Sequence, residues 1–225
     1  MCYPGPVPRA YDDPCGLARA LNLVGERWAM LIVRELLLGP KRFTELRRGL
    51  AGASQSMLTA RLAELEATGV IHRRRLGPPA SAWAYELTAW GRELEPALRQ
   101  LARWGSRTPL TSTNELSIDA MALALTTTFD PTAAGDLRVR CQLRLDGDGL
   151  VVFVHDGQIE VTRAEAPDAD VTIECSGAAF RSLTFGGAAL ASVDASVHGN
   201  RGLATRLLRL FRRPARAPTP AASQA

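Results

Sequence analysis

Gln55, Ser56 and Thr59 are the side chains whose types and spacing most clearly suggest a chemistry. The amide of Gln can bond N6 and N7 of adenine in a bidentate way, and Ser and Thr hydroxyls can bond base edges or phosphates. Ser54 is a typical N-cap residue for a helix that runs to about Thr68. The spacing places the three side chains on the exposed face of its first turns. They are therefore candidates for reading the sequence of double-stranded DNA.

Basic side chains flank this helix and could contact phosphates on both sides of a groove. They are Lys41, Arg42, Arg73, Arg74 and Arg75, with Arg61 inside the helix itself. Arg61 could instead pair with Glu64 or Glu66. The arginine run could be the solvated edge of a strand, on which Arg74 would point away from Arg73 and Arg75.

No constellation in the sequence suggests catalysis or metal binding. His72, His155 and His198 stand alone, and Asp146 and Asp148 have the character of turn residues. Four widely spaced cysteines provide neither a zinc site nor a disulfide framework. We therefore expect no enzyme, no catalytic residue, no cofactor and no metal ion.

The elements that would position the candidate residues are short helices followed by a hairpin. Helical spacing and breakers predict helices over residues 15–24, 26–38, 43–50 and 54–68, the last burying Met57, Leu58, Leu62 and Leu65. Strands are expected over 70–76 and 83–87, around a loop whose prolines exclude a helix. This order is that of a winged helix-turn-helix.

A helix beginning at Thr88 carries an apolar stripe at three- and four-residue steps. Its members are Trp90, Leu94, Leu98, Leu101 and Trp104. Because little core is left for this stripe to cover, we expect it to form a homodimer interface together with Leu17 and Leu21 of the first helix. A symmetric dimer would present two recognition helices about 34 Å apart, matching an inverted repeat.

The net charge of +4 is divided unevenly along the chain. Residues 1–107 carry 16 basic and 10 acidic side chains, residues 108–200 carry 5 and 13, and residues 201–225 carry 6 and none. Because a polyanion is attracted to the first segment and repelled by the second, nucleic-acid contacts are assigned to the N-terminal half. A basic half can equally be a solvated face, so charge alone names no partner.

The C-terminal half has the alternating pattern of half-buried strands. Strands are expected over 138–145, 150–154, 158–163 and 170–174, joined by Asp/Gly turns into an antiparallel meander. Apolar stretches at 121–125, 178–185 and 202–211 predict helices that cover its dry face. The fold class expected for the chain is therefore α+β, a winged helix-turn-helix followed by an α+β domain.

These patterns predict five segments. They are an arm over 1–11, a DNA-binding and dimerisation domain over 12–107, a linker over 108–114, a second domain over 115–212 and a disordered tail over 213–225. No segment has the pattern of a signal peptide or the ~20 apolar residues of a membrane span, so we expect a cytoplasmic protein without a membrane partner.

Several motifs carry resemblances to known families. The N-terminal motifs are CGLARALNLVGERW at 15–28, RELLLGP at 34–40, RFTEL at 42–46, LTARLAEL at 58–65 and YELT at 85–88. In order and spacing they resemble the HxlR family of winged-helix regulators over about residues 12–105, with Gly16 where that family commonly has Pro. The segment DVTIECSG at 170–177, the following helices and VHGN at 197–200 resemble the SCP-2-like sterol-carrier domain over about residues 115–212.

The resemblances imply a transcriptional regulator, expected to act as a homodimeric repressor on double-stranded DNA. Some HxlR-like regulators sense oxidants or electrophiles through a cysteine at the start of the first helix, which implies such a role for Cys15. We favour the alternative that Cys15 is a small buried side chain. A pure lipid carrier is the rival function, but it leaves the basic N-terminal half unexplained.

The SCP-2-like resemblance implies an apolar ligand pocket that could accept a small-molecule effector. Its lining would comprise Val139, Cys141, Leu143, Phe153, Ile173, Phe180, Leu183, Phe185 and Leu190. The alternative, which we favour slightly, is that these side chains form a filled core. An effector could act only by binding the DNA-competent and incompetent states with different affinity.

Overall fold

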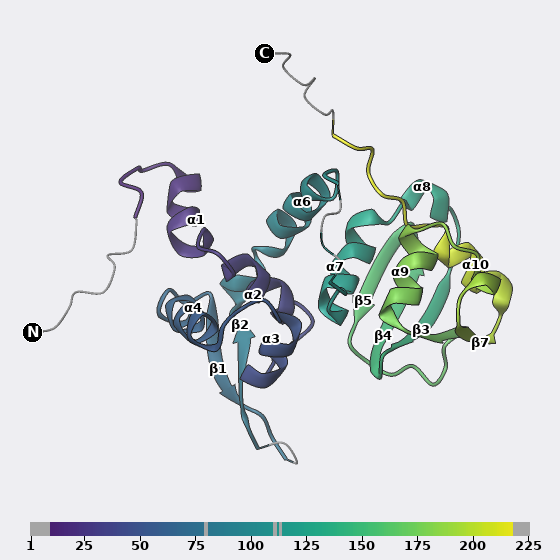
Figure 1. Ribbon diagram of the computed structural model, residues 1–225, viewed down its shortest axis with the longest axis horizontal. Helices are drawn as coiled ribbons and strands as arrows, with labels where there is room; N and C mark the ends of the chain where they lie inside the picture. The colour runs from purple at the N-terminus through teal and green to yellow at the C-terminus, as the bar shows by residue number, and fades with distance from the viewer. Residues whose placement is uncertain (1–9, 79–80, 110–111, 113, 218–225) are drawn as a thin grey trace, which may run out of the picture. The chain divides into compact units, whose positions relative to one another are not determined.

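The computed structural model describes residues 10–78, 81–109, 112 and 114–217 (Figure 1). The chain divides into two compact units, Met1–Leu94 and Glu95–Ala225, which are described separately. The boundary between units lies N-terminal to the domain boundary expected at residue 107. The parts of the expected arm and tail at 1–9 and 218–225 lie outside the described residues.

The first unit has the helices and the hairpin that the sequence predicts. In order they are α1 (Gly16–Val24), α2 (Ala29–Leu36), α3 (Phe43–Gly49), α4 (Gln55–Ala67), β1 (Ile71–Arg75), β2 (Trp83–Leu87) and α5 (Ala89–Arg92). The two strands pair antiparallel, with Ile71 opposite Leu87 and Arg75 opposite Trp83. The core comprises Ile32, Leu36, Leu46, Leu58, Leu62, Leu65 and Ile71, each at most 1% exposed. The winged helix-turn-helix arrangement is confirmed.

Three details of this unit differ from expectation. Met57 is 38% exposed rather than buried. The second helix begins at Ala29 rather than Glu26, because Trp28 has a φ of 79°, in the left-handed region that a helix cannot include. The helix expected from Thr88 to Trp104 is broken after Arg92. It resumes as α6 (Glu95–Gly105), in whose first turn Pro96 lacks the N–H that a continuous helix would need.

The second unit is a five-stranded sheet with helices. After α6 come α7 (Ile118–Thr128), α8 (Pro131–Ala134), β3 (Val139–Leu145), β4 (Asp148–His155), β5 (Gln158–Thr162), β6 (Val171–Cys175), α9 (Gly177–Phe185), a 3₁₀ turn (Leu190–Ser192), β7 (Ala195–Gly199) and α10 (Arg201–Leu208). Helix α9 lies across the sheet, with α10 beside it (Figure 1). The α+β class is confirmed.

The strand order corrects the expected four-stranded meander. The order is β5-β4-β3-β6-β7, so only β3, β4 and β5 form a meander, and β6 pairs parallel with β3. The crossover from β5 to β6 is held by Gln142, which donates to Ala164 O (3.4 Å) and accepts from Ala166 N (2.7 Å). Residues 195–199 add a fifth strand that we did not expect.

Candidate nucleic-acid interface

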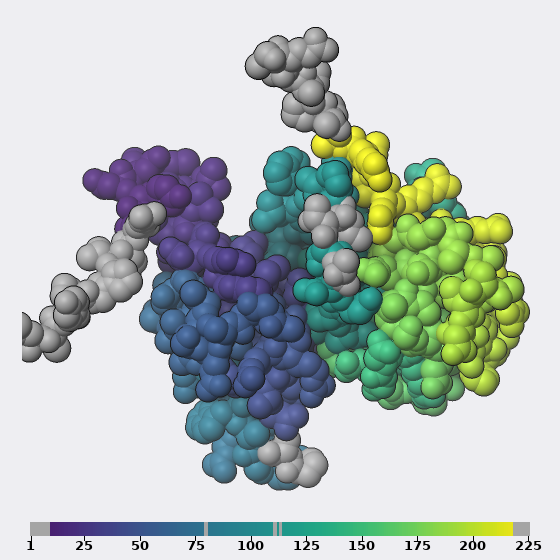
Figure 2. Space-filling model, in the orientation of Figure 1, coloured from purple at the N-terminus to yellow at the C-terminus, as the bar shows by residue number. Residues whose placement is uncertain are grey.

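Helix α4 presents the predicted polar face to solvent. Ser54, Gln55, Ser56 and Thr59 are all exposed, and the surface of α4 is uncovered in the space-filling view (Figure 2). Ser54 Oγ accepts from Met57 N (3.3 Å) and lies 3.2 Å from Ser56 Oγ, and Thr59 Oγ1 donates to Gln55 O (2.9 Å). The Gln55 amide makes no side-chain hydrogen bond within the described part of the chain, so its donor and acceptor face water.

The basic residues around α4 fall into groups with different surroundings. Arg42 is exposed and pairs with Glu45 (3.0 Å) at the start of α3. Burial raises the pKa of Glu45, but hydrogen bonds from Arg42 outweigh it and lower that pKa overall. Arg73 pairs with Glu66 (3.2 Å) and lies over the ring of Tyr85, and Arg74 pairs with Glu86 (3.0 Å).

Arg75 differs from the other two wing arginines. It is exposed and makes no ion pair among the residues that the structure describes. Unlike Arg73 and Arg74, Arg75 therefore loses no ion pair with a described residue when it contacts a phosphate.

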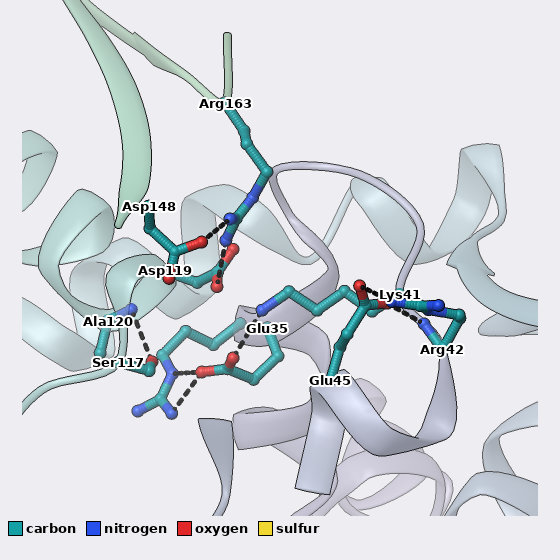
Figure 3. Close-up of polar contacts among 10 residues, drawn as sticks. Glu35, Lys41, Arg42, Glu45, Ser117, Asp119, Ala120, Asp148 and Arg163 are labelled. Atoms are coloured by element: carbon teal, nitrogen blue, oxygen red, sulfur yellow. Dashed lines mark hydrogen bonds and ion pairs between the residues drawn. The ribbon is translucent and has the colours of Figure 1, made fainter. Parts of the chain in front are cut away.

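Lys41 and Arg61 must be withdrawn from the phosphate-contacting set. Lys41 is 9% exposed, and its Nζ lies 2.7 Å from Oε2 of Glu35 (Figure 3). The Glu35 carboxylate is fully buried and also accepts from Arg34. Arg61 is 8% exposed and pairs with Glu26 (3.5 Å) and Glu64, which is one of the alternatives weighed above. Both side chains are therefore largely buried and already paired with carboxylates of the same unit.

Three exposed residues join the candidate interface although sequence reasoning missed them. Arg47 and Arg48 in the last turn of α3 are exposed and make no ion pair among the described residues. Trp83, 65% exposed, lies opposite Arg75 in the wing. The helical period around buried Leu46 could have identified the two arginines, since it places both on the outer side of α3.

Most of the expected interface stripe is exposed. The exposed fractions are 68% for Leu17, 39% for Leu21, 49% for Trp90, 54% for Leu101 and 68% for Trp104, while Leu94 is half-buried. Leu98 is the exception at 5%, because it is already buried within a single chain. A charged substitution at Leu98 would therefore damage the protomer itself and cannot test a dimer.

Cys15 is exposed, so the favoured expectation of a buried side chain is wrong. It occupies the N-cap position of α1, where the backbone N–H groups of Leu17 and Ala18 lower the pKa of the thiol. By contrast, burial raises the pKa of Cys141 to about 12 and that of Cys175 to about 11. Among the described cysteines, Cys15 alone combines exposure with a lowered pKa. Cys2 lies outside the described residues.

The expected pocket residues of the second unit do not form one cavity lining. Val139, Cys141, Leu143, Ile173 and Phe180 are at most 1% exposed, as in a filled core. Phe153 is on the opposite sheet face, because it pairs in register with Arg140 rather than with Val139 or Cys141. Leu183 and Leu190 line a groove of about 870 Å³ along α9 and α10, and Phe185 lines a separate cavity.

The first unit has a helical core, an exposed helix α4 and a two-stranded wing. These features define the class of winged helix-turn-helix proteins. Residues 23–111 match the model of the HxlR-like helix-turn-helix family, and the chain belongs to that family. Residues 130–212 match the SCP-2 sterol transfer family. Both resemblances are confirmed, and the chain is a transcriptional regulator of the helix-turn-helix type.

Two similar proteins each align with less than half of this chain. The uncharacterized HTH-type transcriptional regulator YybR of Bacillus subtilis is 37% identical over 93 residues, 41% of this chain and 74% of that protein. Rv3095 of Mycobacterium tuberculosis, also an uncharacterized HTH-type regulator, is 40% identical over 89 residues, 40% of this chain and 56% of that protein.

Two similar solved structures also align with less than half of this chain. The redox regulator HypR in its oxidized form has 35% identity and a TM-score of 0.40, covering 43% of this chain and 100% of that one. The reduced form of the regulator YodB from B. subtilis has 34% identity and a TM-score of 0.38, covering 41% and 92%. None of the described helices is long and apolar enough to span a membrane.

Proposed function

We propose that this regulator binds an inverted-repeat operator as a homodimer and represses transcription, with α4 in the major groove. The observation that carries the proposal is the solvent-facing surface of α4, where Gln55, Ser56 and Thr59 are exposed at its first turns. An amide and hydroxyls at this place on a second helix suit base edges. Gln55 is the proposed adenine contact.

Exposed arginines on two sides of α4 supply the phosphate contacts in this proposal. Arg42, Arg47 and Arg48 belong to α3 and its N-cap, and Arg75 belongs to the wing. Arg73 can exchange its carboxylate partner for a phosphate, because exposed ion pairs contribute little stability. The partner of Arg74, Glu86, is only 15% exposed, so Arg74 is held more firmly. Trp83, opposite Arg75, offers an aromatic face to the sugar backbone.

The exposed apolar side chains support a second copy of the chain as the partner. Leu17 and Leu21 of α1 and Trp90 of α5 are exposed in the first unit, and Leu101 and Trp104 of α6 are exposed in the second. Side chains of this size at helical spacing gain free energy when another chain covers them. A two-fold dimer would match the symmetry of an inverted repeat.

Binding of purified protein to the DNA upstream of its own gene tests the proposal. We expect a footprint on an inverted repeat with two chains bound per site. If the dimer neutralises about 6 to 10 phosphates, affinity should fall by about 10³ to 10⁵ between 50 and 200 mM salt. Equal affinity for a shuffled duplex, or one chain per site, would contradict it.

A role of the second unit as an effector domain is part of the same proposal. The groove along α9 and α10, lined by Leu183, Leu190, Leu208 and Phe211 among others, has the size of a small-molecule site. The rival function is a lipid carrier whose cargo has no effect on DNA. Repeating the binding assay with extracted lipids separates the two, because only an effector changes operator affinity.

Cys15 favours a second candidate function, regulation by electrophiles. The thiol is exposed, and its pKa is lowered by the N–H groups at the start of α1. A larger thiolate fraction at neutral pH makes it the preferred nucleophile of the described cysteines. The thiolate would add to one carbon of an electron-poor alkene, forming an S–C bond while the neighbouring carbon takes up a proton.

Cys15→Ser and Cys2→Ser variants test this role with N-ethylmaleimide. We expect treatment to reduce operator binding of the Cys2→Ser variant at least about tenfold and to leave Cys15→Ser unaffected, a difference of about 1.4 kcal/mol. Because the pKa is lowered, alkylation of Cys15 should reach half its maximal rate at a lower pH than that of a cysteine in an unfolded peptide. Equal sensitivity of the two variants would remove Cys15 from the mechanism.

A further inference from the structure

A separate cavity of about 460 Å³ lies within the second unit. It is lined by the end of α6, described residues between α6 and α7, helices α7 and α9, and the C-terminal segment. We propose that it binds a small organic anion with an apolar body, such as a medium-chain carboxylate. The residues that carry the argument are Leu116, Ala124, Phe185, Arg181 and Arg213. The volume lies in the range of small-molecule sites, about 300 to 1,000 Å³.

The wall of the cavity combines an apolar surface with two guanidinium groups. Leu116 is 40% exposed although large and apolar, and Ala124 and Phe185 line the same space. The Arg213 guanidinium lies 5.8 Å from the centroid of the Phe185 ring. An amphiphilic anion can therefore place its apolar body on Leu116 and Ala124 and its charged group beside Phe185.

The charge balance at the cavity favours an anion. Arg181 has one carboxylate neighbour, Glu115, at 3.4 Å, and Glu115 is itself 55% exposed. Arg213 makes no ion pair among the residues that the structure describes. One of the two guanidinium groups thus has a carboxylate partner and the other has none within the described ranges. A carboxylate ligand could pair with Arg213 through charge-assisted hydrogen bonds.

Part of the cavity lining lies outside the SCP-2 match. Leu116, Ala124 and Thr128 lie outside the SCP-2 match at 130–212, and Arg213 follows its last residue. Arg181 and Phe185 are the lining residues inside that match. The site is therefore formed where the chain passes from one family match to the next.

Hydrogen bonds hold the C-terminal segment beside the cavity, although we expected residues 213–217 to be disordered. Ala217 N donates to Arg107 O (3.1 Å), and Arg107 Nε donates to Ala215 O (3.0 Å). These bonds keep Arg213 near the end of α6. A ligand would therefore link α6 to α7, α9 and the C-terminal segment.

An effect on DNA binding follows only if the proposed function is right. Helix α6 carries Leu101 and Trp104, which are exposed and belong to the proposed dimer interface. A ligand that restrains the end of α6 would change the free energy of dimerisation. By linkage, operator DNA would then change the affinity for the ligand by the same factor.

Calorimetric titration of the full chain with octanoate and 1-octanol, without DNA, tests the site. The two probes share an apolar chain and differ in charge. We expect octanoate to bind at least about tenfold more tightly than 1-octanol. Arg213→Gln and Arg181→Gln should each weaken octanoate about tenfold, with 1-octanol unchanged. Arg216→Gln, an exposed arginine that does not line the cavity, is the matched control and should bind like the parent.

Ala124→Phe supplies an independent test because the added ring would fill the cavity, so both probes should lose binding. Equal affinity for octanoate and 1-octanol, unchanged octanoate binding in both arginine variants, or no heat of binding would each overturn the proposal. The titration contains no DNA, so its outcome does not depend on whether the chain binds an operator. A ligand that binds without changing operator affinity would refute only the coupling.

Discussion

Replacing Gln55, Ser56 and Thr59 together by Ala is expected to remove operator recognition while leaving the fold intact. All three side chains are exposed, and Ala favours the helical backbone. The N-cap Ser54 is retained, so the bond from Met57 N to its hydroxyl survives. Each good bidentate base contact discriminates against a wrong base by about 1 to 3 kcal/mol. A specificity loss of at least about 100-fold is therefore expected for a dimer with two α4 helices.

Fluorescence anisotropy on the operator and on a shuffled duplex of equal length measures this loss. The triple variant should approach its own non-specific affinity on the operator, while its affinity for the shuffled duplex barely changes. Arg75→Gln is the contrasting variant. The dimer would lose one phosphate contact from each chain, which weakens both complexes alike and lowers the salt slope by about 2. Gln100→Ala, an exposed polar residue of α6, is the matched control for handling and folding. Retained discrimination in the triple variant would refute the placement of α4 in the groove.

The recognition helix could be predicted from the sequence because its signals are local. Ser54 lies directly before α4, and the buried positions Leu58, Leu62 and Leu65 recur at helical steps. The pairing of Arg61 with Glu64 was one of the sequence-based alternatives, but the pairing of Lys41 and the second contact of Arg61 could not be predicted in the same way. Their carboxylate partners Glu35 and Glu26 belong to other elements, and only the packed fold brings them together.

The second unit shows the same limit for strands. The alternation of apolar and polar residues correctly identified the buried residues of β3. Strand pairing is non-local, so this pattern predicted neither the parallel pairing of β3 with β6 nor the added strand β7. Phe153 is apolar, yet it lies on the sheet face of Arg140. The guanidinium groups of Arg138 and Arg140 are 5.0 and 5.1 Å from its ring centroid. The ring of Phe153 therefore makes cation–π contacts, whereas its hydrophobicity alone had suggested a place in the core.

The exposure of Cys15 differs from what is usual for a free cysteine. Free cysteines are usually buried, but this one precedes the first helix, and nothing in the described part of the first unit covers it. The sequence already indicated that Cys15 lies at the start of a helix. This position was better evidence for its surroundings than the usual burial of free cysteines. The N–H groups that lower its pKa are a consequence of that position.

Glu35→Ala is expected to lower the free energy of unfolding of the first unit by about 3 to 5 kcal/mol, because it removes one partner of a buried ion pair. The Glu35 carboxylate is fully buried, 2.7 Å from Lys41 Nζ and 2.7 Å from Arg34 Nη2 (Figure 3). A Cβ at Gly49 would collide with this carboxylate, so the surrounding backbone is shaped around it. Urea unfolding followed by circular dichroism measures the loss, which is a large fraction of the about 5 to 15 kcal/mol typical of a domain.

Two further variants separate this explanation from simple loss of a side chain. Glu66→Ala removes an exposed partner of Arg73, so it should cost less than about 1 kcal/mol. In Glu35→Leu/Lys41→Met both members of the Glu35–Lys41 pair become apolar, and stability should recover relative to Glu35→Ala. Equal stability of Glu35→Ala and Glu66→Ala would show that the buried pair is not a determinant of the fold.

The buried ion pairs of Glu35 with Arg34 and Lys41 also connect the stability of the first unit with its candidate interface. The backbone of Lys41 pairs with Tyr85 of β2 through two hydrogen bonds of 2.9 and 2.8 Å, and Arg42 follows as the N-cap of α3. Glu35 therefore fixes, through Lys41, the point from which both the wing and α3 extend. Below the unfolding transition, Glu35→Ala should thus weaken operator and shuffled DNA alike, because it misplaces the arginines that contact phosphates rather than the side chains that read bases. A selective loss of operator binding would instead place the effect of Glu35 on α4.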